Sequence, residues 1–304
     1  MIRSLAPLSF LLLFAIQITN AQSPVVQTAQ GQVSGSTENG LAVFRGVPFA
    51  APPVGELRWK APQAAPAWKG VKACTKFSAS PIQGEPKPFF CWSEEFIAPP
   101  QPLSEDCLYL NVWTPDASRK KKRPVFVWIY GGGFSSGSSA CAVYDGASYA
   151  RRGIVFVSVN YRVGALGFLS HPELSAEGGG TSGNYGILDQ VAALKWVRQN
   201  IAAFGGDPEQ VTIAGQSAGS MSINALIATP TAKGLFQRAI AQSGGLFGGI
   251  SFRSLRNGEE QGLAFQKKLG ARSMAEMRAL PADSRSEEHT SELQSLTNLV
   301  CRLL

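Results

Sequence analysis

The sequence is poor in charge, histidine and cysteine. Charged residues make up 16% of its 304 residues, against 44% hydrophobic residues, and it has only 2 histidines and 5 cysteines. The hydrophobic share excludes a disordered chain, and 32 glycines with 19 prolines in no regular period exclude a collagen-like one. No H-E-x-x-H motif and no Cys/His cluster at ligand spacing occurs, so we expect neither a metal nor another cofactor.

The net charge of +7 is concentrated in residues 119–123, which read RKKKR. Elsewhere between residues 22 and 284 the basic and acidic side chains nearly balance, 20 against 18. Such a run is typical of a solvated loop before the strand that follows it. We therefore expect no nucleic-acid partner.

The first 21 residues have the pattern of a secretory signal peptide. One basic residue precedes an apolar stretch from Leu5 to Ile18, and Thr19 and Ala21 are suitable for the −3 and −1 positions of a cleavage site. The stretch is shorter than the roughly 20 apolar residues that cross a membrane, and no later segment reaches that length. We expect cleavage near Ala21, a secreted or periplasmic protein, and no stable membrane insertion.

Four cysteines lie in the middle of the chain: Cys74, Cys91, Cys107 and Cys141. In an oxidising compartment they can form two disulfides, and four cysteines allow three pairings. We favour a disulfide that includes Cys107, with either Cys74 or Cys91 as its partner.

The segment 285–304 differs in amino-acid composition from the rest of the chain. It opens with the eleven residues RSEEHTSELQS, where the glycine-rich composition gives way to a Ser/Glu/Leu string. A common short-read sequencing adapter, read in one frame, encodes the same residues. We therefore expect an adapter-derived tail and a native chain that breaks off near Asp283 or Ser284. The alternative is a genuine amphipathic helix with Leu293, Leu296 and Val300 on one face.

Apolar runs at residues 125–130, 154–159 and 211–214 predict strands. Because they lack polar alternation, they are typical of strands buried on both faces, in a parallel or mixed sheet covered by helices. A helix between the second and third runs is predicted to end at Gly205-Gly206. Its apolar stripe consists of Ile187, Val191, Leu194, Val197 and Ile201.

A second helix is expected to begin after Ser217 and to run through Ala228, before Pro230. This alternation of strands and helices predicts an α/β fold, with a mostly parallel, doubly wound central sheet and helices on both faces. The first hundred residues contain short β-like pieces among Pro and Gly, which favour an antiparallel edge and surface loops.

Residues 215–219 read GQSAG and match the G-x-S-x-G motif between a predicted strand and a predicted helix. This context is that of a nucleophile elbow, which lifts the Ser217 hydroxyl above the sheet edge. Glycines fit there because the turn is too sharp for β-carbons. The N-terminus of the following helix then points at the developing negative charge.

A glycine-rich turn, residues 131–134, follows the first predicted strand. Two of its amides, together with the amide of Ala218, are placed to hold a tetrahedral oxyanion. The alternatives are a purely structural turn or a phosphate loop. A phosphate loop is disfavoured, because no Lys-Ser/Thr pair follows the glycines.

Several further motifs, spread over most of residues 25–284, accompany the elbow. They read FRGVPFA (44–50), PPVGELRW (52–59), SEDCLYLNVW (104–113), WIYGGGF (128–134), NYRVG (160–164), NYGILDQ (184–190) and FGGDP (204–208). With these motifs the chain resembles the type-B carboxylesterase and cholinesterase family of α/β hydrolases. The resemblance implies an α/β-hydrolase domain, of which residues 22–284 form the N-terminal part.

The resemblance also implies hydrolysis of a small-molecule carboxylic ester through an acyl-enzyme. On matching positions Ser217 is the nucleophile, and Gly132, Gly133 and Ala218 are the oxyanion donors. The acid and the histidine of such a triad lie in a C-terminal half that this sequence does not contain. Since a serine hydroxyl is a poor nucleophile without a base, we expect this fragment to be inactive.

The two histidines do not replace the missing base. His171 follows the second predicted strand in a loop and is expected to be structural, and His289 belongs to the suspect tail. Gln216 stands where the family usually has Glu, which weakens attraction for cationic acyl-choline substrates. The resemblance further implies two ion pairs, Arg45 with Glu105 and Arg162 with Asp189.

Two other functions remain open. One is a catalytically dead adhesion or binding module on the same fold, which the intact elbow around Ser217 disfavours. The other is a different acyl transfer at the same serine, such as thioester or amide cleavage.

Overall fold

The structure is a computed structural model that describes residues 23–88, 90–100, 102–245 and 254–282. The expected signal peptide and the expected adapter-derived tail, with His289, lie outside the described residues. Within the described part of the chain, no helix is both long and apolar enough to span a membrane.

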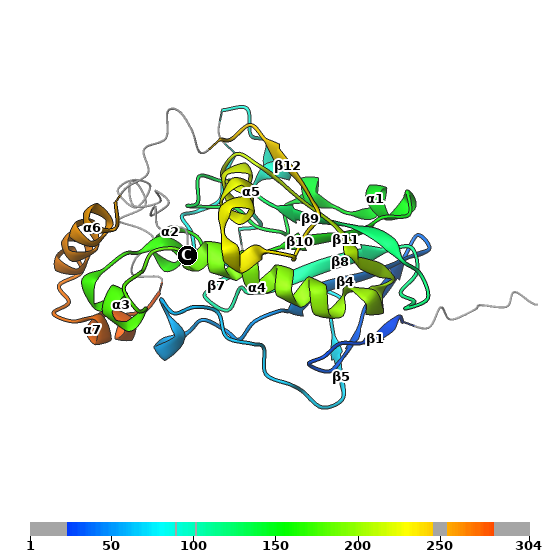
Figure 1. Cartoon of the computed structure of the whole chain (residues 1–304), viewed down its shortest axis with the longest axis horizontal. Helices are drawn as coiled ribbons and strands as arrows, with labels where there is room; N and C mark the ends of the chain where they lie inside the picture. Colours follow the sequence, from blue (N-terminus) through cyan, green and yellow to red (C-terminus); the bar gives the residue numbers. More distant parts are fainter. Residues whose placement is uncertain (1–22, 89, 101, 246–253, 283–304) are drawn as a thin grey trace, which may run out of the picture.

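A seven-stranded sheet forms the centre of the molecule (Figure 1). Across the sheet, the strands are β12 (Arg238–Gln242), β11 (Gly206–Gln216), β9 (Arg123–Ile129), β10 (Val155–Val159), β8 (Tyr109–Thr114), β4 (Leu41–Pro48) and β3 (Ser36–Glu38). The first four run parallel to one another. The last three continue the sheet with antiparallel pairing. The expected mixed sheet with an antiparallel edge is confirmed.

The three apolar runs of the sequence are strands β9, β10 and β11, as predicted. Val157 of β10 pairs with Val127 of β9 on one side and with Val112 of β8 on the other. β11 is longer than predicted, because Gly206 already pairs with β9 before an irregularity, after which regular pairing resumes at Val211.

Helices cover both faces of the sheet, as the strand β10 shows. Val155 and Val157 face the main core, which also contains side chains of α4 (Tyr185–Asn200) and α5 (Ala218–Ala228). Phe156 between them faces the opposite side, where it packs with Ala150 of α1 (Ala147–Arg151). This alternation is what burial of a strand on both faces requires.

The two predicted helices are α4 and α5. After α4 a short 3₁₀ turn (Ile201–Phe204) ends at Gly205, whose φ of 83° is left-handed and therefore suits glycine. α5 ends at Ala228, and Pro230 opens the next 3₁₀ turn. Both ends agree with the sequence prediction.

A second apolar cluster lies at one end of the molecule (Figure 1). It is built where α2 (Gly164–Phe168), α3 (Pro172–Glu177), α6 (Leu255–Lys268) and α7 (Met274–Ala279) meet the segment around Trp59. Trp59, Leu174 and Met277 are almost completely buried in it. Helices α6 and α7 are therefore part of the folded domain.

Two small sheets complete the strand inventory of the described residues. A three-stranded sheet joins β1 (Val25–Gln27), β2 (Gln32–Ser34) and β5 (Val71–Ala73). A two-stranded sheet pairs β6 (Ser80–Pro81) with β7 (Leu103–Ser104).

One of the two expected ion pairs is confirmed and the other is wrong. Arg162 and Asp189 form a fully buried pair with an Nη2–Oδ1 distance of 2.7 Å. Glu105, however, pairs with Arg58 and not with Arg45. Arg45 of β4 instead pairs with Glu38 of the neighbouring strand β3.

The expected disulfide of Cys107 is not formed in the structure, where all four cysteines of the described residues are free thiols. Cys74, Cys107 and Cys141 are buried, whereas Cys91 is exposed. Burial raises the pKa of Cys74 and Cys141 to about 11 and that of Cys107 further. These three are therefore neutral thiols near pH 7.

Candidate active site

Ser217 stands between the end of β11 and the start of α5, as the elbow motif predicts. Its φ of 56° and ψ of −123° form a combination that residues other than glycine rarely adopt. Two backbone hydrogen bonds hold it: its N–H donates to the carbonyl of Gln242 (2.9 Å), and its carbonyl accepts from Met221 (3.0 Å). The half-buried serine is thus fixed by β12 on one side and by α5 on the other.

Both glycines of the elbow lie against the end of β9. A β-carbon on Gly219 would lie 2.2 Å from the carbonyl oxygen of Ile129 and 2.8 Å from that of Tyr130. A β-carbon on Gly215 would lie 2.8 Å from the same Ile129 oxygen. Since such distances are far below van der Waals contact, only glycine allows β9 and the elbow to approach this closely.

The close approach brings the glycine-rich turn to the nucleophile. A β-carbon on Gly131 would lie 2.5 Å from the carbonyl oxygen of Gln216 and 3.0 Å from Cβ of Ser217. Gly132 and Gly133 follow with φ of 117° and 62°, and both are exposed. Sequence reasoning placed this turn beside the serine, and the structure brings the two together.

The N–H groups of Gly132 and Gly133 donate to no acceptor among the described residues. The turn is instead closed through the carbonyl of Gly132, which accepts from the N–H groups of Ser135 and Ser136, both at 3.0 Å. Ala218 is the first residue of α5, where backbone N–H groups lack an intrahelical acceptor and the helix dipole is positive. These three amides are the donors proposed from the sequence.

Two tyrosines hold the turn in place, a feature that sequence reasoning missed. Tyr130 precedes the glycines and stacks on Tyr161, with ring centroids 4.4 Å apart. Tyr130 donates its hydroxyl to the carbonyl of Tyr161 (3.0 Å), and Tyr161 donates to the carbonyl of Tyr130 (2.8 Å). This reciprocal clamp ties the start of the turn to the segment after β10. Its sequence signal is weak, because nothing in either motif indicates that the two rings meet.

A second missed feature is the support behind Ser217. A β-carbon on Gly244 would lie 2.4 Å from the carbonyl oxygen of Ser217, so the chain after β12 passes directly behind the elbow. Ser220 donates its hydroxyl to the carbonyl of Gly244 (2.5 Å), and Asn224 Nδ2 donates to the carbonyl of Ser220 (2.8 Å). The Gly244-Gly245 pair was the available signal in the sequence.

No general base reaches Ser217 within the described residues. His171 is 1% exposed. Its Nδ1 accepts from the N–H of Glu173 (3.2 Å), and its Nε2 lies 3.0 Å from Gln266 Oε1. It therefore caps α3 and links this helix to α6, which confirms the structural role expected for it. The hydroxyl of Ser217 itself has no hydrogen-bond partner among the described residues.

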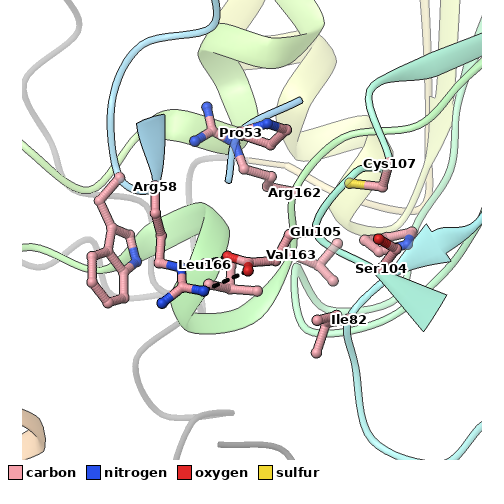
Figure 2. Close-up of a pocket in the computed structure, with 11 residues that line it drawn as sticks. Pro53, Arg58, Ile82, Ser104, Glu105, Cys107, Arg162, Val163 and Leu166 are labelled. Carbon is pink, nitrogen blue, oxygen red and sulfur yellow. Dashed lines mark hydrogen bonds and ion pairs between the residues drawn. The ribbon is translucent and has the colours of Figure 1, made fainter. Parts of the chain in front are cut away.

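A small cavity lies elsewhere, around the Arg58–Glu105 ion pair (Figure 2). Cys107, Arg162 and Leu166 also line it, and Ser217 does not. Its charged side chains already pair with one another or with Asp189. No residue of the elbow or of the glycine-rich turn lines this cavity, so it is separate from the candidate active site. No group of side chains suited to hold a metal ion occurs among the described residues.

Comparison with known proteins gives a consistent result. The model of the carboxylesterase family matches residues 22–294, which extends into the segment expected to be adapter-derived. Fumonisin B1 esterase from Sphingopyxis macrogoltabida is 45% identical over 248 residues, covering 81% of this chain and 44% of that protein. Para-nitrobenzyl esterase from Bacillus subtilis is 48% identical over 221 residues, covering 72% of this chain and 43% of that protein.

Solved structures agree with these sequence relatives. The carboxylesterase EST55 of Geobacillus stearothermophilus superposes with a TM-score of 0.76 at 39% identity, covering 90% of this chain and 54% of its own. A para-nitrobenzyl (PNB) esterase structure gives 0.76 at 38% identity, with 90% and 53% covered. The chain thus spans about half the length of the relatives it matches.

Proposed function

This chain belongs to the carboxylesterase family, and from this premise we propose that its protein hydrolyses small-molecule carboxylic esters through an acyl-enzyme on Ser217. One observation carries the proposal. Ser217, with its strained backbone, packs against the glycine-rich turn, and the N–H groups of Gly132 and Gly133 in this turn have no acceptor among the described residues. Such a constellation of nucleophile and oxyanion donors is what acyl transfer requires.

The proposed reaction has two steps. In the first, Ser217 Oγ attacks the ester carbonyl carbon while a base takes its proton, and the carbonyl electron pair moves onto oxygen. The N–H groups of Gly132, Gly133 and Ala218 stabilise this oxyanion. Collapse breaks the bond to the alcohol, which leaves with the proton from the base. In the second step, water attacks the acyl-enzyme in the same way and releases the acid.

The base is the part that the described residues do not supply. Both ring nitrogens of His171 are already engaged, and the imidazole is buried. Without a base, a serine hydroxyl is largely protonated and weakly nucleophilic at neutral pH. We therefore propose that the 304-residue chain is inactive on its own and that a histidine and an acid from further polypeptide complete the triad.

The substrate proposal is limited to the class of reaction. The relatives' names specify two different substrates, a para-nitrobenzyl ester and fumonisin B1. Gln216, next to the nucleophile, is uncharged and therefore offers no carboxylate to attract a cationic substrate. We propose an esterase for uncharged or anionic esters, secreted or periplasmic as the first 21 residues indicate.

The test compares this chain with the uninterrupted reading frame of its genomic locus. The 304-residue chain is expected to release no p-nitrophenolate from p-nitrophenyl butyrate above the buffer rate. The longer product is expected to give a burst equal to the enzyme concentration, followed by steady turnover. Ser217→Ala should abolish both phases, and Ser148→Ala, at an exposed site in α1, should change neither.

Three results would contradict the proposal. The first is turnover by the Ser217→Ala variant, and the second is a locus that encodes no histidine downstream. The third is a longer product that cleaves thioesters or amides but no esters. Efficient turnover by the 304-residue chain would contradict only the requirement for further polypeptide.

A further inference from the structure

We propose that Gln83 is a positioning residue for the oxyanion donors, because its side-chain amide fixes the direction in which the N–H group of Gly132 points. Gln83 follows strand β6, 54 positions before the residue of the turn region that it contacts. It acts through the backbone and does not touch Ser217. The positioning rests on hydrogen bonds and packing, whereas its effect on the reaction rests on the proposed function.

Gln83 binds the backbone of Gly137 at both of its polar groups. Gln83 Oε1 accepts from the N–H of Gly137 (2.8 Å), and Nε2 donates to the carbonyl of Gly137 (2.9 Å). Nε2 also donates to the carbonyl of Pro81 (2.9 Å), which fixes the orientation of the amide. Gln83 is only 6% exposed, so water does not readily replace these hydrogen bonds. Gly137 therefore has one defined position.

Gly137 in turn lies directly against the start of the glycine-rich turn. A β-carbon on Gly137 would lie 2.5 Å from the ring of Tyr130 and 2.7 Å from the carbonyl oxygen of Gly131. Its φ of 118° is in the region that favours glycine. The carbonyl of Gly131 thus lies on the side of the chain that faces Gly137, and the close packing leaves it no room to move further in that direction.

The direction of the oxyanion N–H groups follows from the planarity of the peptide bond. In a trans peptide, the C=O of one residue and the N–H of the next point in opposite directions. Because the carbonyl of Gly131 faces Gly137, the N–H of Gly132 points away from Gly137. The carbonyl of Gly132 accepts from two serine amides within the turn, so the N–H of Gly133 points out of the turn in the same way.

The segment that carries Gln83 is itself anchored to the rest of the domain. β6 pairs with β7, and Ser80 of β6 donates its hydroxyl to the hydroxyl of Ser138 (2.8 Å). Asn160, directly after β10, donates from Nδ2 to the carbonyl of Ala79 (3.2 Å). The side chains of Ser80, Ser138 and Asn160 are buried. Gln83 is therefore a fixed support for the turn.

Loss of the Gln83 amide should affect the transition state more than the substrate complex. It leaves the polar groups of Gly137 without their partner and frees the peptide group of Gly132 to rotate. The oxyanion forms only after the nucleophile attacks, so a misdirected N–H group lowers kcat and hardly changes KM. Since removal of one oxyanion donor costs about 10²–10³ in kcat, loss of its support should cost about tenfold or more.

The experiment measures Gln83→Met in the product of the uninterrupted reading frame, with p-nitrophenyl butyrate as substrate. Methionine has a similar length but makes none of the three hydrogen bonds. We expect kcat to fall about 10- to 100-fold and KM to change less than about twofold. Affinity for an alkyl trifluoromethyl ketone, whose carbonyl oxygen becomes an oxyanion when the serine adds to it, should fall by a similar factor.

Gln266→Met is the matched control. Gln266 is also a buried glutamine, and its amide contacts the imidazole of His171 (3.0 Å), away from the elbow. This variant should leave kcat and the ketone affinity unchanged. If Gln83→Met does not fold, Gln83→Glu is the second variant. It keeps an acceptor for the N–H of Gly137 and loses the donor to its carbonyl, so kcat should again fall with KM nearly unchanged.

Hydrogen exchange in the 304-residue chain tests the positioning without any activity. The N–H groups of Ser135 and Ser136 donate to the carbonyl of Gly132, and their exchange reports how firmly the turn is held. In the peptide that covers residues 131–137, these amides should exchange about tenfold faster in Gln83→Met than in the unaltered chain. In Gln266→Met they should exchange at the unaltered rate.

The outcomes separate this inference from the proposed function. A kcat of Gln83→Met within about twofold of the unaltered enzyme would overturn the inference. So would an equal fall of kcat in Gln266→Met, a change confined to KM, or unchanged exchange of the turn. Faster exchange in Gln83→Met, together with an unaltered locus product that cleaves no ester, would leave the positioning standing and contradict the proposed function.

Discussion

Replacing Glu105 by alanine should destabilise the protein far more than replacing Glu38, although each carboxylate pairs with one arginine. Glu105 accepts from Nε and Nη2 of Arg58, both at 2.5 Å, and the two side chains are 11% and 6% exposed. Glu38 pairs with Arg45 in the same bidentate way, but its side chain is 41% exposed. The comparison therefore isolates the effect of burial.

The magnitudes follow from the charge that is left behind. Without Glu105, the guanidinium of Arg58 stays buried, and among the described residues only the neutral carbonyls of Met277 (3.5 Å), Arg278 (2.6 Å) and Leu280 (2.9 Å) still accept from it. Stranding a buried charge costs about 3–5 kcal/mol. The Arg45–Glu38 pair is closer to the surface, since Glu38 is 41% and Arg45 14% exposed, so the loss without Glu38 is about 0–1 kcal/mol.

Urea unfolding of the 304-residue chain, followed by tryptophan fluorescence, measures both variants at pH 7. For a domain of this size the larger loss lowers the thermal midpoint by roughly 10 °C. Equal losses for Glu105→Ala and Glu38→Ala, or a loss below about 1 kcal/mol for Glu105→Ala, would refute the assignment of Arg58 as a buried charge held by Glu105.

Three further expectations concern the elbow, one ion pair and the thiols. Gly219→Ala places a β-carbon 2.2 Å from the Ile129 carbonyl oxygen, so it should cost at least about 2 kcal/mol in urea unfolding; an unchanged midpoint would contradict the close packing of β9 on the elbow. Hydrogen bonds from Arg45 lower the pKa of Glu38 to about 2 from 4.5, so Glu38 adds stability above pH 4.5 and loses it as the pH falls toward 2. The small stability difference between the unaltered chain and Glu38→Gln should therefore shrink between pH 5 and pH 3, and a difference that grows there would have the wrong sign. In a Cys301→Ser background, Ellman's reagent at pH 8 should label Cys91 quickly and leave the buried Cys74, Cys107 and Cys141 unlabelled until urea is added; no fast thiol would indicate that Cys91 is in a disulfide.

The sequence predicted the parts of the fold that are determined by residues close together in the chain. β10 is a run of apolar residues without alternation, and the burial of its every residue follows from that pattern. α5 begins after Ser217 and ends before Pro230, where the chemistry of a single residue decides the boundary. The elbow and the glycine turn were predicted for the same reason, since G-x-S-x-G and Gly-Gly-Gly each specify a backbone shape.

What the sequence left open depends on contacts between distant segments. The ion pair of Glu105 is one example. Arg45 and Arg58 both lie in the sequence motifs, so the motifs do not tell which of them pairs with Glu105. In the structure Arg58 does so, and it also donates to the carbonyl of Arg278 in α7. The reciprocal clamp of Tyr130 and Tyr161 is similar, since two rings 31 residues apart carry no shared pattern. The disulfide prediction rested on the number of cysteines and an expected oxidising compartment, whereas pairing depends on proximity in the fold, where Cys107 is buried and Cys91 is exposed.

The hydrogen bonds between Arg58 and α7 also have a consequence for local unfolding. Arg58 donates to the carbonyl of Arg278 across 220 positions of the chain, and Arg278 in turn donates to the carbonyl of Arg58 (3.1 Å). Fraying of α6 and α7 would therefore have to expose the Arg58–Glu105 pair and Trp59 at the same time. The amide protons of α6 and α7 should therefore exchange with solvent through the same cooperative opening as those of the segment around Trp59. The free energy of this opening should be higher than that of helices that fray independently. The last described helices and a segment near the start of the chain thus form one unit of local stability.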